Sequence, residues 1–141
     1  MFLDASVIVA VLKNEPESPA LLNAMEGARG KLRHSGITRL EASMALARTY
    51  KEQRGDTHAT AQDFETASQL VSELLEVLES YEVHITGSIA DAAIRALAQY
   101  GHMVGHKAKL KFGDALSYAC AKAYHAPLLY KGKDFKHTDL L

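Results

Sequence analysis

Four acidic residues that lie far apart in the sequence carry the most chemical interest: Asp4, Glu41, Asp114 and Asp134. Carboxylates held close together repel one another and raise each other's pKa unless a cation neutralises them. The hard divalent ions Mg²⁺ and Mn²⁺, which prefer oxygen ligands, are the natural partners of such a group. A metal held in this way can lower the pKa of a bound water and stabilise charge on a phosphoryl group. If the four acids converge, they predict metal-assisted hydrolysis of a phosphodiester.

The predicted elements bring these acids together. Short apolar segments at 1–3, 32–37, 81–85 and 126–130 alternate with helical patterns, and this alternation is typical of an α/β fold with a parallel sheet covered by helices. Ligands in such folds bind beyond the carboxyl ends of the strands. Asp4 follows the first segment, residues 38–41 follow the second and residues 131–134 follow the last. We therefore expect the acids at one edge of the sheet.

Each acid taken singly also has a purely structural explanation. Asp4 and Asp114 stand where helices are predicted to begin, and acids there are favoured by capping and by the helix dipole. Thr38-x-x-Glu41 matches a capping box. Asp134 lies in a turn-like segment, where aspartate is common. For Glu41 in particular, the sequence leaves the capping and the catalytic interpretation open.

Composition limits the classes of protein to consider. The chain has 141 residues, 48% of them apolar, a net charge of −1 and one cysteine. It has no apolar stretch near the roughly 20 residues that span a bilayer and no pattern of a signal peptide. A single cysteine excludes an internal disulfide and fits a reducing compartment, so we expect a cytoplasmic protein. No G-x-x-x-x-G-K-[ST] or G-x-G-x-x-G motif is present. The near-neutral charge requires any contact with nucleic acid to be local.

Four stretches resemble the motifs of one family, in order and over essentially the whole chain. M-F-L-D-A-S-V-I-V-A-V-L resembles the first motif of PIN domains, and T-R-L-E-A-S-M-A-L resembles the second. A-K-L-K-F-G-D-A-L-S-Y-A-C-A-K-A is similar to the third. P-L-L-Y-K-G-K-D-F-K-H-T-D-L is similar to the C-terminal motif of VapC-type toxins. The third and fourth motifs are the more specific pair.

The resemblance implies a single PIN domain over residues 1–141, with a short central parallel sheet flanked by helices. It implies a metal-dependent ribonuclease that uses Mg²⁺, for which Mn²⁺ can substitute. Asp4 and Asp114 would be the most direct metal ligands, Glu41 would be a ligand or orient the metal's waters, and Asp134 would complete the pocket. Many members of the family are toxins silenced by a cognate antitoxin, and homodimers are common.

Other positions are assigned more loosely. Ser6 and Thr38 lie close to the acids in sequence and are candidates to hydrogen-bond them. An antitoxin is expected to lay a helix in a groove near residues 18–29 and 39–53 and to bring an arginine toward the acids.

Lysines surround two of the acids. Lys111 stands where relatives often have Asn, and Lys133 where they often have Asp or Asn, which puts substrate choice in question. If residues 107–112 are extended, Lys109 and Lys111 lie on one side of the segment that leads to Asp114. Lys109, Lys111 and Lys133 are thus candidate RNA contacts, since cations beside an acidic pocket suit a polyanion. A solvated basic loop is the alternative.

Two other functions remain compatible with the sequence. The same fold could process RNA or act on DNA. Alternatively, the chain could be a non-catalytic binding module in which the carboxylates only cap helices.

Overall fold

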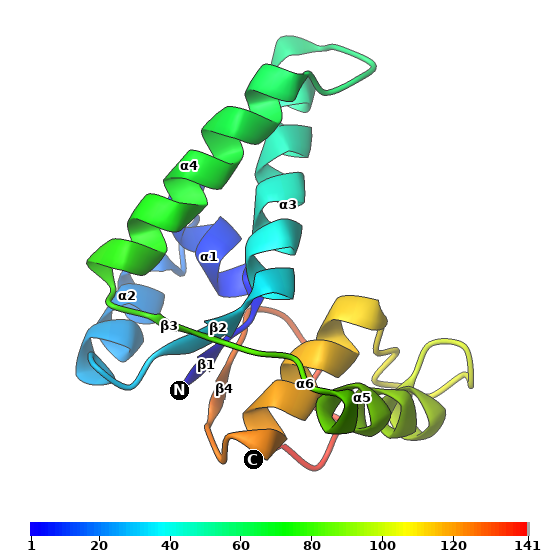
Figure 1. The fold of residues 1–141 in the computed structure, drawn as a ribbon. Coiled ribbons are helices and arrows are strands. Elements are labelled where there is room, and N and C mark those ends of the chain that lie inside the picture. The colour runs from blue at the N-terminus through cyan, green and yellow to red at the C-terminus, as the bar shows by residue number, and fades with distance from the viewer. Residues whose placement is uncertain (141) are drawn as a thin grey trace.

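The computed structural model describes residues 1–140 and shows helices packed on both faces of a small sheet (Figure 1). The strands are β1 (Phe2–Leu3), β2 (Arg33–Ser35), β3 (Tyr81–Val83) and β4 (Leu128–Leu129). The helices are α1 (Ala5–Leu12), α2 (Ser18–Gly27), α3 (Gly36–Arg54), α4 (Ala61–Val77), α5 (Gly87–Tyr100) and α6 (Phe112–Ala123). Within residues 1–140, no helix combines the length and apolar character needed to cross a membrane.

The four strands form a parallel sheet in the order β3-β2-β1-β4. The predicted α/β fold with a parallel sheet is confirmed, although each strand is shorter than its apolar segment. In β1, Phe2 pairs with Arg33 on one side and with Leu128 on the other. The strand that precedes Asp4 is thus held between two neighbours in the middle of the sheet.

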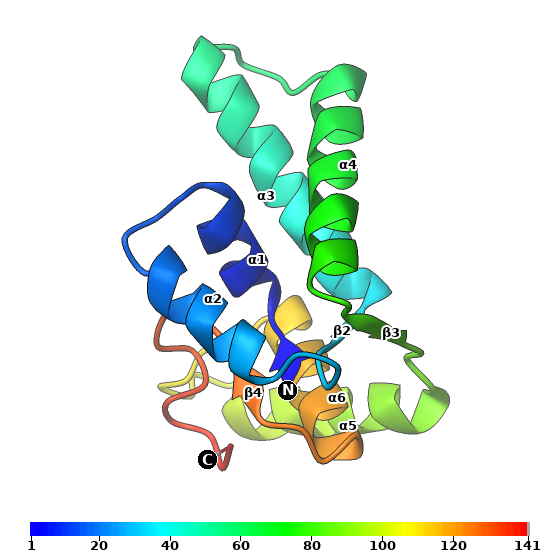
Figure 2. The ribbon, with the colours of Figure 1, turned by 90° about the vertical axis from the view of Figure 1, so that its left-hand side faces the viewer.

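Adjacent side chains of β1 point to opposite faces of the sheet, as strand geometry requires. Leu3 packs into a core built with α1, α2, α3 and α4, whereas Phe2 packs into a second core with α5 and α6. Figure 2 shows these helices on the two sides of the short strands. Both residues are fully buried. Because both faces of the strand are buried, the N-terminal segment is continuously apolar and does not alternate between apolar and polar residues.

A third cluster fixes the segment after β4. Phe135 is 2% exposed and packs with Tyr100, Leu110 and Tyr118. Its ring also meets that of Tyr130 edge-on, with 4.8 Å between centroids. The turn that carries Asp134 is therefore anchored to the core by the residue that follows it.

The hairpin of α3 and α4 rises clear of the rest of the molecule (Figure 1). Its tip is closed by Arg54, whose guanidinium donates to both oxygens of the Asp63 carboxylate at 2.5 and 2.7 Å. The buried face of α4 is formed by Ala67, Val71 and Leu75. Leu70 lies outside this face and is 37% exposed.

Candidate active site

Three of the predicted acids meet beyond the carboxyl ends of the central strands. Asp4 follows β1, Glu41 lies in the second turn of α3, and Asp114 lies in the first turn of α6. The charges of Asp4 and Asp114 both act on Glu41, and those of Asp4 and Asp134 both act on Asp114. Acids from four separate parts of the chain thus lie close enough to influence one another.

Asp4 is the most enclosed of the four, at 6% exposure. It caps α1, because its Oδ2 accepts a hydrogen bond from the backbone N–H of Ser6 at 3.0 Å. Its Oδ1 accepts a hydrogen bond from the hydroxyl of Ser117 at 2.8 Å. The capping interpretation is therefore correct for this residue, and it accounts for only one of the two oxygens.

Ser117 was not singled out by the sequence, yet it touches the site directly. It is buried on α6, three residues after Asp114. Residues three apart lie on the same helix face, and this spacing is the signal that could have identified it.

Glu41 does not cap α3. The capping box is made one turn earlier, where the Ser35 hydroxyl accepts from the backbone N–H of Thr38 and the Thr38 hydroxyl accepts from that of Ser35, both at 3.2 Å. The capping interpretation of Thr38-x-x-Glu41 is wrong, because α3 begins at Gly36 rather than at Thr38. Glu41 instead extends toward α6, where a Cβ on Gly113 would lie only 1.8 Å from its Oε1.

Asp114 is held at the start of α6. Its Oδ2 accepts a hydrogen bond from the backbone N–H of Lys111 at 2.8 Å. This is again a capping contact, and it uses one carboxylate oxygen. As for Asp4, a structural role and a role in the site are compatible.

The environment makes two of these acids harder to ionise. Burial raises the pKa of Glu41 to about 7, and the negative charges of Asp4 and Asp114 add to the effect. Burial likewise raises the pKa of Asp114 to about 6; the hydrogen bond from the N–H of Lys111 opposes this increase, and the charges of Asp4 and Asp134 add to it. Perturbed carboxylates grouped in this way are typical of functional sites.

These pKa values predict how the stability of the metal-free protein depends on pH. A carboxyl whose pKa is higher in the folded than in the unfolded state favours folding most at low pH, because the folded state binds the proton more tightly. The melting temperature in EDTA should therefore fall as pH rises from about 4 to about 7, the range bounded by the ordinary and the raised values of Asp114 and Glu41. In Glu41→Gln the melting temperature should fall less steeply over the upper part of this pH range.

Differential scanning calorimetry at several pH values tests the prediction. Glu65→Gln, which changes an exposed acid on α4, is the matched control and should leave the profile unchanged. A profile of Glu41→Gln identical to that of the unaltered protein would contradict the proximity of these charges.

The two hydroxyl residues assigned loosely from the sequence join the site to its surroundings. The backbone N–H of Ser6 donates to Asp4, and its hydroxyl accepts from the backbone N–H of Lys131 at 2.9 Å. The Thr38 hydroxyl, besides its contact with Ser35, donates to the carbonyl of Leu3 at 3.4 Å. Thr38 thus ties the start of α3 to the end of β1, and it acts on the backbone next to Asp4 rather than on a carboxylate.

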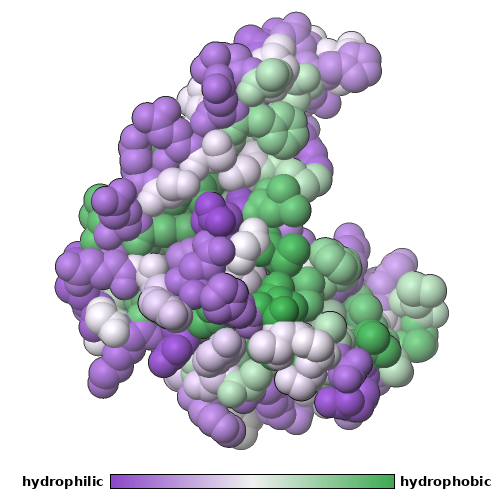
Figure 3. Space-filling model, viewed as in Figure 1, coloured by the Kyte–Doolittle hydropathy of each residue, from purple (hydrophilic) through white to green (hydrophobic). Residues whose placement is uncertain are grey.

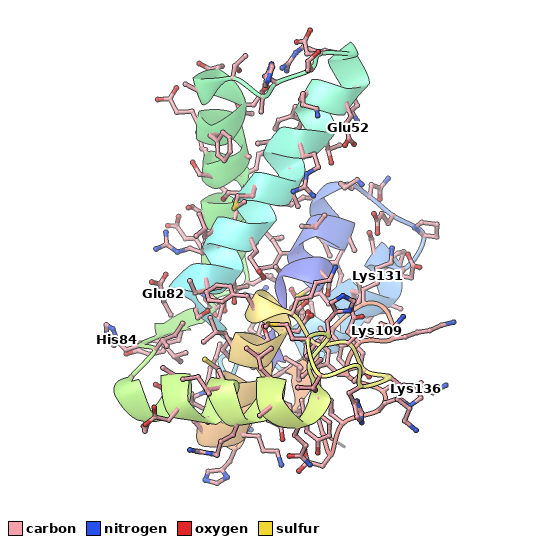
Figure 4. All side chains as sticks on the ribbon, turned by 90° about the vertical axis from the view of Figure 1, so that its right-hand side faces the viewer. Glu52, Glu82, His84, Lys109, Lys131 and Lys136 are labelled. Atoms are coloured by element: carbon pink, nitrogen blue, oxygen red, sulfur yellow. The ribbon has the colours of Figure 1, made fainter. Side chains whose placement is uncertain are left out.

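The candidate RNA-contacting lysines lie exposed on one side of the acids. Lys109, Lys111 and Lys133 are all exposed. Residues 107–112 are not extended, so the condition for placing these lysines on one side is not met: Lys109 is in a turn with φ +56°, and its N–H bonds to the carbonyl of His106. Figure 4 places Lys109, Lys131 and Lys136 on the same side of the molecule, opposite Glu82 and His84.

Lys131 has a different role from the other lysines. Its ammonium group pairs with Glu15 and, at 3.3 Å, with Glu17, and so links the C-terminal turn to the segment after α1. Glu15 and Lys131 also line an open pocket of about 350 Å³ together with Asp4, Ser6 and Glu41. Glu15 is therefore a fifth acid at this site, which the sequence motifs did not indicate.

The donor set suits a hard divalent cation. All the predicted ligands are carboxylates, and the negative charges of their neighbours add to the increase in pKa that burial causes at Glu41 and Asp114. Within residues 1–140, no three acidic, histidine or cysteine side chains are placed so that they could hold a metal ion without moving. A cation would relieve the repulsion and allow the carboxylates to approach more closely.

Comparisons with known proteins agree with this geometry. The family model described as "PIN domain" matches residues 1–141. A VapC ribonuclease of Rhizobium meliloti is 39% identical over 99% of this chain and 98% of its own length. Ribonuclease VapC28 of Mycobacterium tuberculosis is 35% identical over 98% of this chain and 93% of its own length.

Among solved structures, M. tuberculosis VapC20, described as a toxin that cleaves the sarcin-ricin loop, superposes with a TM-score of 0.73. It covers 99% of this chain and 95% of its own at 15% identity, and so supports the fold. A toxin–antitoxin complex from Klebsiella pneumoniae gives a TM-score of 0.61 at 19% identity, over 98% of this chain and 92% of its own. The chain belongs to the PIN domain family, in the group of the VapC ribonucleases.

Proposed function

We propose that this protein is a metal-dependent endoribonuclease and the toxin of a VapBC-type toxin–antitoxin pair, acting in the cytoplasm as one PIN domain. The convergence of Asp4, Glu41 and Asp114, whose charges add to the effect of burial on the pKa values of Glu41 and Asp114, carries the proposal. The identity of 39% to a VapC ribonuclease over nearly the whole chain supports it independently.

In this proposal Asp4 and Asp114 hold Mg²⁺ or Mn²⁺, Glu41 is a further ligand or orients bound water, and Asp134 completes the pocket. When bound, the metal supplies an activated water and stabilises charge on the phosphoryl group. The hydroxyl of Ser117 and the N–H of Ser6 each donate to one oxygen of Asp4 and so fix the plane of its carboxylate. The N–H of Lys111 does the same for one oxygen of Asp114.

We assign RNA binding to the exposed lysines beside the acids. Lys109, Lys111 and Lys133 lie in the loops that carry or precede Asp114 and Asp134, so a phosphate backbone bound by them passes the carboxylates. Lys131 is excluded from this role because it is paired with Glu15 and Glu17.

For the antitoxin we propose the apolar surface formed by Leu40, Met44, Phe64 and Phe112, all of which are exposed. Figure 3 shows apolar side chains gathered in the hollow between the α3–α4 hairpin and the lower helices. A pocket of about 450 Å³ in this surface is lined by Leu40, Met44 and Phe112 and also by Glu41, so a helix bound here reaches the acids. The proposed surface includes α3, as the sequence led us to expect, and adds α4 and the start of α6 rather than α2.

A small neighbouring gene encoding a protein that occupies this surface and silences the enzyme would support the antitoxin assignment. We also propose a homodimer, by analogy with the family. Size-exclusion chromatography with light scattering tests it.

The decisive experiment is cleavage of transfer, ribosomal and messenger RNA by the purified protein in Mg²⁺ or Mn²⁺ and in EDTA. We expect cleavage with either metal and none in EDTA, because the carboxylates supply no activated water of their own. A parallel panel of single- and double-stranded DNA separates the ribonuclease from a DNA nuclease of the same fold. A protein that cuts no substrate and binds no Mn²⁺ would be a non-catalytic binding module.

A further inference from the structure

We propose that the first turn and a half of α6 positions the acids, with Gly113 and Ser117 as the two positioning residues. The proposal rests on the proposed function, because it concerns the geometry of the same metal site. Asp114 directly follows Gly113, and Ser117 lies four residues after Gly113, so the three residues share one side of the helix. From that side Gly113 contacts Glu41, Asp114 supplies a carboxylate, and Ser117 contacts Asp4.

Gly113 provides the surface against which Glu41 rests. A Cβ at this position would lie 1.8 Å from Oε1 and 2.3 Å from Oε2 of Glu41, far inside van der Waals contact. The backbone does not require glycine here, because Gly113 lies within α6 and is not among the residues with positive φ. Glycine is therefore required at this position by the neighbouring carboxylate and not by the conformation of the chain.

The clash would be relieved by moving Glu41, since a glutamate carboxylate is the far end of a flexible side chain. Gly113→Ala should thus leave the fold intact and displace Glu41 from Asp114. Alanine is also a better helix former than glycine, so the substitution by itself should not destabilise α6.

Ser117 fixes Asp4 from the same helix. Its buried hydroxyl donates to Asp4 Oδ1 at 2.8 Å, and the two residues are 113 positions apart in the chain. Without the Ser117 hydroxyl, Asp4 keeps only the hydrogen bond from the N–H of Ser6 to its Oδ2, and its carboxylate is free to rotate about that contact. Partners that orient metal ligands typically contribute 10- to 100-fold to metal affinity or activity.

The test is the affinity of the full-length protein for Mn²⁺, measured by titration calorimetry, together with the melting temperature in EDTA. Gly113→Ala is compared with Gly87→Ala, a glycine in the first turn of α5 with open space around it. We expect roughly 10- to 100-fold weaker Mn²⁺ binding for Gly113→Ala and no change for Gly87→Ala. The melting temperature of Gly113→Ala should not fall.

A double-mutant cycle establishes that Gly113 acts through Glu41. In the Glu41→Ala background the carboxylate that a new Cβ would meet is gone, so Gly113→Ala should cause no further loss of Mn²⁺ affinity. This double variant also has room for the alanine, and it keeps the test valid if Gly113→Ala alone were to fold poorly.

Ser117→Ala is compared with Ser18→Ala, which removes a buried hydroxyl that donates to the Ala10 carbonyl at 2.8 Å. Both variants lose a buried hydrogen bond, and only Ser117→Ala should weaken Mn²⁺ binding, by about tenfold.

The outcomes separate this proposal from the function on which it rests. Tight Mn²⁺ binding by the unaltered protein, Gly113→Ala and Ser117→Ala alike would overturn the positioning role and leave the nuclease standing. An equal loss from Gly113→Ala with and without Glu41 would overturn the route through Glu41. An unaltered protein that binds no Mn²⁺ would overturn the proposed function and this proposal together.

Discussion

Asp114→Asn should lower RNA cleavage by roughly 100- to 1,000-fold and leave the fold unchanged. Losses of this order follow removal of one group that stabilises charge in a transition state. Asparagine keeps the shape of the side chain and can still accept the hydrogen bond from the N–H of Lys111. It removes one negative charge from a group of acids that repel one another. The metal-free variant should therefore be at least as stable as the unaltered protein at pH 7.

Single-turnover cleavage of the RNA panel and thermal unfolding, measured on the same preparation, test this prediction. Asp91→Asn, which changes an exposed acid on α5, is the control and should match the unaltered protein in both assays. A large loss of stability in Asp114→Asn would contradict the prediction that the folded state does not need this negative charge. Full activity in a folded Asp114→Asn would remove this residue from the metal site.

Phe135→Ala should have the opposite effect, a large loss of stability. Its ring is 2% exposed and fills a cluster with Tyr100, Tyr118 and Tyr130. Truncating a buried Phe to Ala typically costs about 3–5 kcal/mol, a large share of the roughly 5–15 kcal/mol that stabilises a domain. Because Phe135 anchors the turn that carries Asp134, activity should fall even at temperatures where the variant is still folded.

Urea unfolding measures the change in the free energy of unfolding. Phe112→Ala is the matched control, because this ring is 66% exposed, and it should change stability by no more than about 0.5 kcal/mol. A loss below about 1 kcal/mol in Phe135→Ala would mean that the segment after β4 is not packed as the structure shows.

The sequence predicted the features that depend on local pattern. Short apolar segments predict the strands, and apolar residues at helical spacing predict the helices, wherever burial is regular. The sheet edge that gathers Asp4, Glu41 and Asp114 follows from the parallel topology.

Contacts between distant residues could not be predicted in this way. Gly113 against Glu41, Ser117 on Asp4 and Lys131 with Glu15 each join segments whose packing is set by the whole fold. The spacing of Ser117 from Asp114 places the serine on the same helix face, but no local pattern tells which distant residue each member of these pairs will meet.

Competition between equally good local patterns explains the wrong capping prediction and the conformation of residues 107–112. Ser35-x-x-Thr38 and Thr38-x-x-Glu41 are overlapping candidates for a helix start, and the structure uses the first. At residues 107–112 the alternation of lysine with apolar residues suggests an extended segment. Burial of Ala108 and Leu110 satisfies that alternation, while a left-handed turn at Lys109 interrupts the extended backbone.

The position of β1 in the sheet has a consequence for synthesis of the protein on the ribosome. β1 emerges first, yet its N–H groups bond to the carbonyls of Pro127 and Leu129, and Asp4 is oriented by Ser117. A nascent chain lacking its last helix and strand therefore leaves Asp4 without these partners and without Asp114. If Asp4 and Asp114 belong to the active site as proposed, that site is complete only when the polypeptide is almost finished, and the messenger RNA that encodes it meets no working site during most of translation.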